Sequence, residues 1–73
     1  MIQLTTPWSS LSDRELEVVG LLYELDSNKA IARRLSLAEA TVKQRFTHAM
    51  SKVGVTSRLQ LAVKWELAMR GLA

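Results

Sequence analysis

"ATVKQRFTHAMSKVG", residues 40–54, contains four side chains that are or can become cationic, and no carboxylate. A helix of this length normally mixes its charges, because opposite charges three or four residues apart stabilise it. The seven acidic residues of the chain all lie outside this segment. Since a carboxylate repels phosphate groups, such a charge pattern is expected of a helix that lies against a polyanion.

The 3.6-residue period of a helix divides this segment into two faces. Its apolar side chains fall in one stripe about 100° wide, the predicted core side: Val42, Phe46, Ala49, Met50 and Val53. The opposite face carries Ala40, Lys43, Gln44, Thr47, His48 and Ser51. A helix can enter the major groove of B-DNA, where lysine bonds to guanine and glutamine to adenine. The polar face is therefore a candidate DNA-reading surface.

The flanking residues predict an all-α fold of four helices and no strand. The first helix begins at a capping box formed by Ser12 and Glu15. Its expected inward side chains are Leu11, Leu16, Val18, Val19, Leu22 and Leu25. A short second helix, KAIARRL (residues 29–35), is capped by Ser27 or Asn28. With the longer helix after it, this forms a helix-turn-helix pattern.

Cap and stop residues also predict the bounds of the last two helices. Ser36 stands three residues before Glu39, the spacing of a second capping box that opens the third helix. That helix ends at Gly54, a residue that favours the left-handed conformation. The fourth helix is expected to run from about residue 58 to residue 69, with Gly71 ending it.

The charge of the chain is unevenly distributed. Residues 1–26 hold one basic residue against five acidic ones, whereas residues 27–58 hold seven basic residues against one acidic residue. A basic middle third is typical of a chain that binds a polyanion. A solvated basic surface without a partner has the same pattern.

The composition limits the other function classes. The 73 residues form one domain and contain no cysteine and one histidine, so we expect no disulfide, metal or cofactor. No apolar run approaches the roughly 18 residues that span a membrane, and no secretory signal is present. We therefore expect a cytoplasmic protein; the family resemblance described next implies association with the bacterial nucleoid. An enzyme is the least expected class, since there is no nucleophile–base–acid set and His48 has no carboxylate near it in sequence.

Four blocks of sequence resemble the DNA-binding domain of LuxR-type regulators. They occur in the order of that family, and their spacing requires no insertion or deletion. They lie within residues 11–63 and read LSDRELEVVGLL, SNKAIARRL, TVK and KVGVTSRLQLAV. The resemblance implies a LuxR-type (GerE-like) helix-turn-helix domain over residues 11–73, preceded by an N-terminal extension or linker at residues 1–10. It also implies that the third helix, at about residues 38–53, lies in the major groove and that the fourth helix pairs two domains.

By position, the resemblance assigns roles to individual residues. Base reading falls to Lys43, Gln44 and Thr47. Phosphate contacts fall to Ser27, Asn28, Lys29, Thr41 and Arg45. The implied partners are double-stranded DNA, a second copy of the chain, and RNA polymerase or a partner regulator. Whether the chain would activate or repress is left open.

Some positions depart from the family pattern. Arg45 stands where histidine is usual, Ala30 where glutamate is usual, and Ala38 where a serine cap is usual. We expect Ser36 to replace the lost cap by starting the third helix earlier. Leu25 stands where many members have glycine, so the turn there is expected to be rebuilt around Asp26.

The fourth helix carries two apolar stripes, whereas a monomeric surface helix needs only one. Leu61, Trp65, Ala68 and Leu72 form one stripe, and Leu59, Val63 and Leu67 form the other, roughly opposite. The second stripe is a candidate dimer interface. A two-fold dimer would place its reading helices about 34 Å apart and would require a palindromic site.

Two other functions remain open. The chain could be a small interaction module that pairs with a larger regulator through its fourth helix and inhibits it. Residues 41–53 also resemble region four of bacterial sigma factors, which bind promoters, although GVTSRLQLAV (residues 54–63) favours the LuxR-type pattern.

Overall fold

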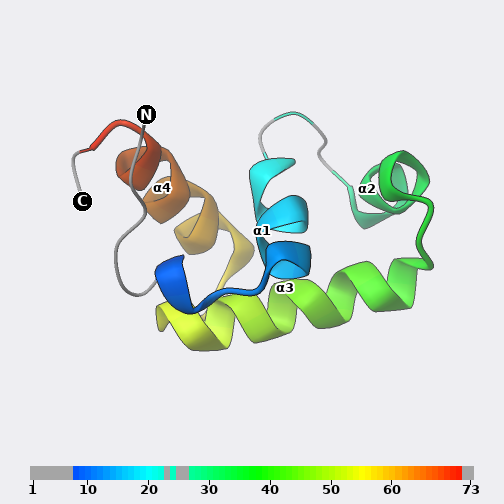
Figure 1. The fold of residues 1–73 in the computed structure, drawn as a ribbon, viewed down its shortest axis with the longest axis horizontal. Helices are drawn as coiled ribbons and strands as arrows, with labels where there is room; N and C mark the ends of the chain where they lie inside the picture. Colours follow the sequence, from blue (N-terminus) through cyan, green and yellow to red (C-terminus); the bar gives the residue numbers. More distant parts are fainter. Residues whose placement is uncertain (1–7, 23, 25–26, 72–73) are drawn as a thin grey trace.

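The computed structural model describes residues 8–22, 24 and 27–71, and every regular element in these ranges is helical. A short 3-10 turn, η1 (Trp8–Ser10), precedes four α-helices: α1 (Asp13–Gly20), α2 (Asn28–Leu35), α3 (Glu39–Val53) and α4 (Arg58–Met69). The expected all-α, four-helix fold is confirmed. In Figure 1, α3 runs along one side of the molecule, α1 lies against it, and α2 and α4 lie toward its two ends.

Three of the four helices begin at a serine that caps them. Ser12 Oγ accepts from the backbone N–H of Glu15 at 3.1 Å, and a Glu15 carboxylate oxygen accepts from Ser12 N–H at 2.9 Å. The predicted capping box is therefore confirmed. Ser27 caps α2 and Ser57 caps α4, each accepting the N–H three residues further on at 3.1 Å. Ser27, and not Asn28, is thus the cap of α2.

The turn between α2 and α3 differs from the prediction. Ser36 adopts the left-handed conformation, with φ of 56°, and ends α2, while Leu37 N–H bonds to the Ala32 carbonyl at 2.8 Å. An N-cap residue needs extended backbone, which Ser36 does not have. The extended residue before α3 is Ala38, which makes no side-chain cap bond. The expected capping box of Ser36 and Glu39 is therefore wrong, and the lost cap is not replaced.

One hydrophobic core joins η1, the four helices and the turns between them. Its buried members are Trp8, Leu11, Val18, Val19, Leu22, Ile31, Ala32, Val42, Phe46, Ala49, Val53 and Leu61. Three predicted inward residues, Leu16, Leu35 and Met50, are only partly buried. The predictions made for Leu25, Asp26 and Leu72 lie outside the described residues.

Trp8 belongs to the core although it lies within the expected N-terminal extension. Its side chain is buried, and its ring meets the Trp65 ring of α4 edge-on, with 5.1 Å between the ring centroids. Sequence analysis gave Trp8 no role because no helical period leads up to it. The domain boundary expected at residue 11 stays a prediction, but η1 packs with the helices that follow it.

Glycines end the last two helices, as predicted. Gly54 has φ of 85° and donates to the Met50 carbonyl at 2.8 Å, which closes the last turn of α3. Gly71 follows α4 with φ of 74°. Because L-residues rarely adopt these angles, glycine suits both positions.

Candidate nucleic-acid interface

The polar face predicted for α3 is solvent-exposed. All six of its residues are exposed: Ala40, Lys43, Gln44, Thr47, His48 and Ser51. On the opposite side of the helix, Val42, Phe46, Ala49 and Val53 are buried. The buried and exposed faces of α3 therefore agree with those that the helical period predicted.

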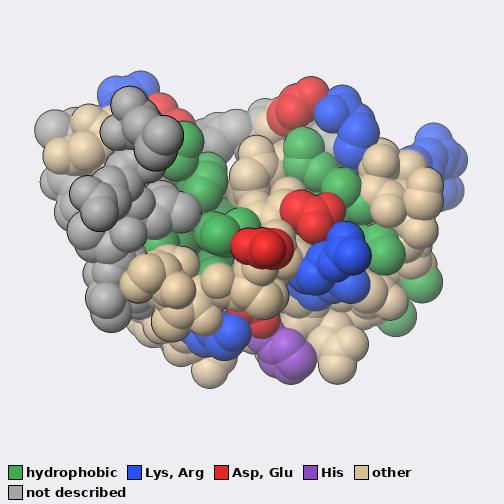
Figure 2. Space-filling model, in the orientation of Figure 1, with side chains coloured by type: hydrophobic (Ala, Val, Ile, Leu, Met, Phe, Trp, Pro, Cys, Tyr) green, Lys and Arg blue, Asp and Glu red, His purple; other side chains and the backbone are tan. Residues whose placement is uncertain are grey.

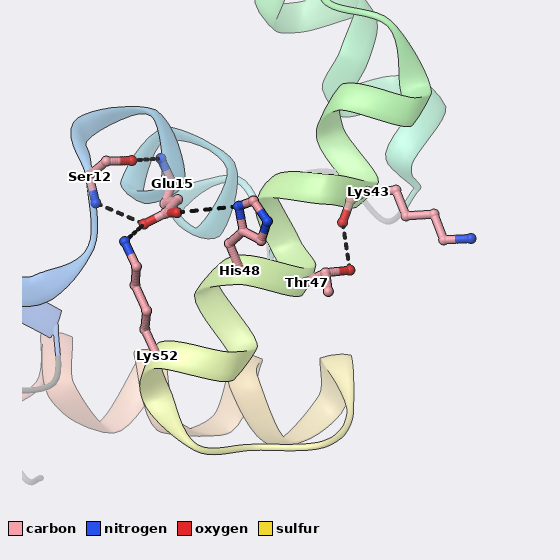
Figure 3. Close-up of polar contacts among 6 residues, drawn as sticks. All are labelled: Ser12, Glu15, Lys43, Thr47, His48 and Lys52. Atoms are coloured by element: carbon pink, nitrogen blue, oxygen red, sulfur yellow. Dashed lines mark hydrogen bonds and ion pairs between the residues drawn. The ribbon is translucent and has the colours of Figure 1, made fainter.

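Lys43 and Thr47 point away from α1 (Figure 3). The Thr47 hydroxyl donates to the backbone carbonyl of Lys43 at 3.0 Å. Because its hydrogen is used within the helix, Thr47 offers the lone pairs of its oxygen, and its methyl group, to anything that approaches this face. Lys43 offers an exposed ammonium group beside it.

An open hollow of about 510 Å³ lies where α2 and α3 begin, beside the first residue of α4. It is lined by Ser27, Asn28, Lys29, Glu39, Ala40, Lys43 and Arg58. Three of these side chains are cationic and one is anionic. The residues of α2 expected to contact phosphate and the base-reading candidate Lys43 therefore share one surface.

The other two residues expected to contact phosphate are less accessible. Thr41 and Arg45 are both half-buried. The Nη1 atom of Arg45 is buried and has no hydrogen-bond partner among the described residues. Arg45 therefore offers only part of its side chain to a ligand, and it does not line the hollow beside Lys43.

Arg58 contributes to this surface, although sequence analysis gave it no role. Its guanidinium group lies 4.6 Å from the centroid of the buried Phe46 ring of α3. It also donates a hydrogen bond to the side-chain oxygen of Asn28 at the start of α2. The residues are 12 and 30 positions apart, so no local sequence pattern indicates these contacts.

A buried carboxylate lies behind the polar face, where α1 meets α3 (Figure 3). Glu15 is 7% exposed and accepts from the ammonium of Lys52 at 2.7 Å. Burial raises the pKa of Glu15, but hydrogen bonds from Lys52 and from Ser12 outweigh it, so the pKa is lowered overall. The carboxylate is therefore held ionised.

His48 lies next to this ion pair. Its Nδ1 atom is 3.9 Å from a Glu15 carboxylate oxygen, and its side chain remains 56% exposed. The statement that His48 has no carboxylate near it holds for the sequence but is wrong for the fold, which brings α1 against α3.

The face of the molecule drawn in Figure 2 mixes acidic, basic and histidine side chains. Arg14 pairs with Glu17 at 3.2 Å, and Arg34 pairs with Glu24 at 2.9 Å. Exposed pairs of this kind contribute little to stability and leave little net charge.

The outer stripe of α4 is exposed. Leu59 is 73% exposed, Val63 47% and Leu67 37%. A mostly apolar hollow of about 420 Å³ lies alongside, lined by Gly54, Val55, Leu59, Gln60, Val63 and Lys64. The described chain therefore presents apolar surface at a place separate from the α3 polar face. Within the described ranges, no helix is both long and apolar enough to cross a membrane.

The sequence of the chain matches a known protein family. The family model described as bacterial regulatory proteins, luxR family, matches residues 9–65. Over 64 residues, 88% of this chain, the sequence is 45% identical to a protein of Mycobacterium bovis named as an HTH-type transcriptional regulator. Over 57 residues, 78% of the chain, it is 46% identical to the DNA-binding transcriptional activator DevR/DosR of Mycobacterium tuberculosis. The same share is 42% identical to the transcriptional regulatory protein LiaR of Bacillus subtilis.

These relatives are much longer than the match. The chain spans 7% of the Mycobacterium bovis protein, 26% of DevR/DosR and 27% of LiaR. No solved structure is significantly similar to the chain.

Proposed function

The chain belongs to the luxR family of bacterial regulatory proteins, and we propose that it is a sequence-specific DNA-binding transcriptional regulator. The observation that carries this proposal is the exposed polar face of α3. It offers cationic and hydrogen-bonding side chains, and residues 40–54 contain no carboxylate that would repel DNA. Such a regulator acts where the DNA is, at the nucleoid in the cytoplasm.

In this proposal α3 lies in the major groove. Lys43 donates to guanine O6 or N7, and Gln44 pairs with adenine. Thr47 accepts a hydrogen bond from a base amino group or contacts a thymine methyl, because its own hydrogen already bonds to the helix. These three exposed residues lie on the side of α3 opposite the core.

Phosphate contacts position the reading helix. Ser27, Asn28 and Lys29 stand at the start of α2, where the helix dipole favours an anion, and line the same hollow as Lys43. Thr41 and the exposed part of Arg45 complete the set. These contacts give affinity for any DNA sequence, whereas the base contacts distinguish one sequence from another.

We also propose that two copies pair through the outer stripe of α4. Leu59, Val63 and Leu67 are exposed in the single chain and would be buried in a pair. A two-fold dimer presents two reading helices and binds a palindromic site. The same stripe would serve a chain that pairs with a larger regulator and inhibits it. Measuring whether the free protein forms a homodimer distinguishes a dimeric regulator from a module that pairs with a different protein.

The role of Lys43 is tested by comparing Lys43→Ala with Arg14→Ala. Both remove one exposed positive charge, but Arg14 pairs with Glu17 within α1 and does not line the hollow that Lys43 lines. Lys43→Ala should weaken binding to a selected duplex by about 1–3 kcal/mol and relax the preference at one base pair. Arg14→Ala should change neither quantity. Equal effects of the two substitutions on affinity and on base preference would place the reading surface elsewhere.

A further inference from the structure

We propose that Arg58 is a positioning residue for DNA binding, and that it acts through Asn28. In this account Arg58 fixes the side-chain amide of Asn28 with its oxygen turned inward, so that the amide N–H groups are left to bind a phosphate oxygen. The inference rests on the proposed DNA-binding function and adds a residue that the family resemblance did not assign.

The contacts of Arg58 tie three helices together at one point. Arg58 is the first residue of α4, Asn28 is the first residue of α2, and Phe46 lies in the middle of α3. The guanidinium group lies over the Phe46 ring and donates through Nη1 to Asn28 Oδ1. Because Phe46 is buried, with 4% of its surface exposed, it gives the guanidinium a rigid support.

The hydrogen bond to Asn28 determines which end of the amide faces outward. A side-chain amide has one oxygen, which only accepts, and one NH₂ group with two donors. With Oδ1 accepting from Arg58, neither N–H donor of Asn28 bonds to another described residue, so both can bind a ligand. Without Arg58, the amide could rotate about its terminal bond and present its oxygen, which repels a phosphate group.

The surroundings of Asn28 favour an anion. Asn28 lines the hollow at the start of α2 together with Lys29 and Lys43. The hydroxyl of its neighbour Ser27 accepts from the backbone of α2 at 3.1 Å, so that oxygen is directed to the helix. A phosphate group in the hollow would therefore meet two ammonium groups and the amide N–H donors. Glu39, at the edge of the hollow, is the one carboxylate of the lining.

Arginine suits this place in a way that lysine does not. A planar guanidinium can stack on a ring and donate in its own plane at the same time, whereas an ammonium is a compact point charge. Arg58→Lys therefore keeps the positive charge but loses the combined stack and hydrogen bond. The substitution separates positioning from simple attraction of DNA.

The test is a double-substitution cycle measured by fluorescence anisotropy on a selected duplex, with Arg58→Lys, Asn28→Ala and the double variant of the full chain. Arg58→Lys should weaken binding about tenfold, or about 1.4 kcal/mol, when Asn28 is present. In the Asn28→Ala background the same change should cost less than about twofold, because there is no amide left to position. The dependence of affinity on salt should stay the same for Arg58→Lys, since the number of cations is unchanged.

Two further variants keep the inference falsifiable if Arg58→Lys unfolds the chain. Asn28→Asp keeps an acceptor for Arg58 but removes both donors, so it should lower DNA affinity at least about tenfold without lowering the melting temperature. Lys29→Ala is the matched control, because it removes a neighbouring charge with no contact to Arg58 among those described. Its effect should combine additively with that of Arg58→Lys and should lower the salt dependence.

Three outcomes would overturn the inference. The first is an equal loss from Arg58→Lys with and without Asn28. The second is unaltered DNA affinity for Asn28→Asp. The third is a loss of affinity that only follows a lowered melting temperature. In each case specific binding by the unsubstituted chain would leave the proposed function standing, whereas no binding by that chain would reject both.

Discussion

At the scale of single residues, Glu15 joins α1 to α3 through an ion pair between its buried carboxylate and the partly exposed ammonium of Lys52. Its pKa is lowered in the folded chain, so the folded state holds the ionised form more tightly than the unfolded chain does. The resulting stabilisation is present above the unfolded pKa of about 4.5 and is lost as the pH falls through the lower, folded pKa. Lys52 and His48 are the charged or titratable groups that face this carboxylate.

Glu15→Gln should therefore lower the free energy of unfolding by about 1–2 kcal/mol at pH 7. The difference from the unsubstituted chain should shrink as the pH falls below about 4.5, where Glu15 itself becomes protonated. Urea unfolding between pH 7 and pH 3 measures it. Glu17→Gln, at an exposed ion pair, is the control and should change stability little at any pH. A Glu15→Gln difference that does not vary with pH would contradict the assignment.

Ser36 carries a local cost that a single substitution can remove. Its φ of 56° is unfavourable for a residue with a Cβ atom, whereas glycine adopts it readily. Ser36→Gly should raise the free energy of unfolding by about 0.5–1 kcal/mol, as seen in thermal unfolding. The same substitution at Ser51, exposed in α3, should destabilise the chain instead. Destabilisation by Ser36→Gly would show that the serine makes a contact that compensates for its backbone.

The contacts of single residues were the least predictable part of the site. The exposure of Lys43, Gln44 and Thr47 follows from the helical period of one segment. The contact between His48 and Glu15 depends on how two helices pack, and it joins residues 33 positions apart. Arg58 reaches Asn28 across 30 positions in the same way. The residue pattern within one helix therefore cannot predict a contact between side chains of two different helices.

At the scale of elements, cap residues predicted the start or end of a helix correctly where the sequence offered a single candidate for the cap. Ser12 opens α1 and Gly54 ends α3, as predicted, and α4 begins at the expected residue 58, with Ser57 as its cap. The turn between α2 and α3 was mispredicted because Ser36 stood at capping-box spacing from Glu39. In the fold, that serine is used to end α2, and the extended N-cap position falls on Ala38.

The outer stripe of α4 can be tested as a dimer interface by a single substitution. Val63→Glu places a charge at the centre of the proposed dimer interface, at a side chain that is 47% exposed in the single chain. The dimer should dissociate, because burying an unpaired carboxylate is costly, while the helical content and melting of the monomer should change little. Sedimentation measures the first quantity and circular dichroism the second. An unchanged dimer would reject this stripe as the interface.

A substitution just after the same helix, with an even larger change of charge, distinguishes a local effect from a general one. Arg70→Glu also makes the chain more acidic, at an exposed position beyond the last turn of α4. It should leave the dimer intact. Dissociation by both variants would indicate that pairing responds to total charge and not to the stripe.

At the scale of the whole molecule, charge and apolar surface are separated in space. Lys29 of α2 and Lys43 of α3 line the candidate DNA interface, Arg14 and Arg34 pair with carboxylates, and the α4 stripe is exposed beside its own hollow. Composition and periodicity predicted an all-α domain with a basic polar helix. Neither periodicity nor the family resemblance specified which helices touch, so the packing of α1 against α3 was not predicted. The place of Trp8 in the core could not be predicted in either way.

The most direct test of the central claim is fluorescence anisotropy of the full chain against a random duplex pool and a palindromic duplex selected from it, over a series of salt concentrations. A sequence-specific regulator should bind the selected duplex at least about a thousandfold more tightly than the pool, with an affinity that falls steeply as salt rises. Weak binding that is equal for the two duplexes would contradict the claim and would favour the interaction module that pairs through α4.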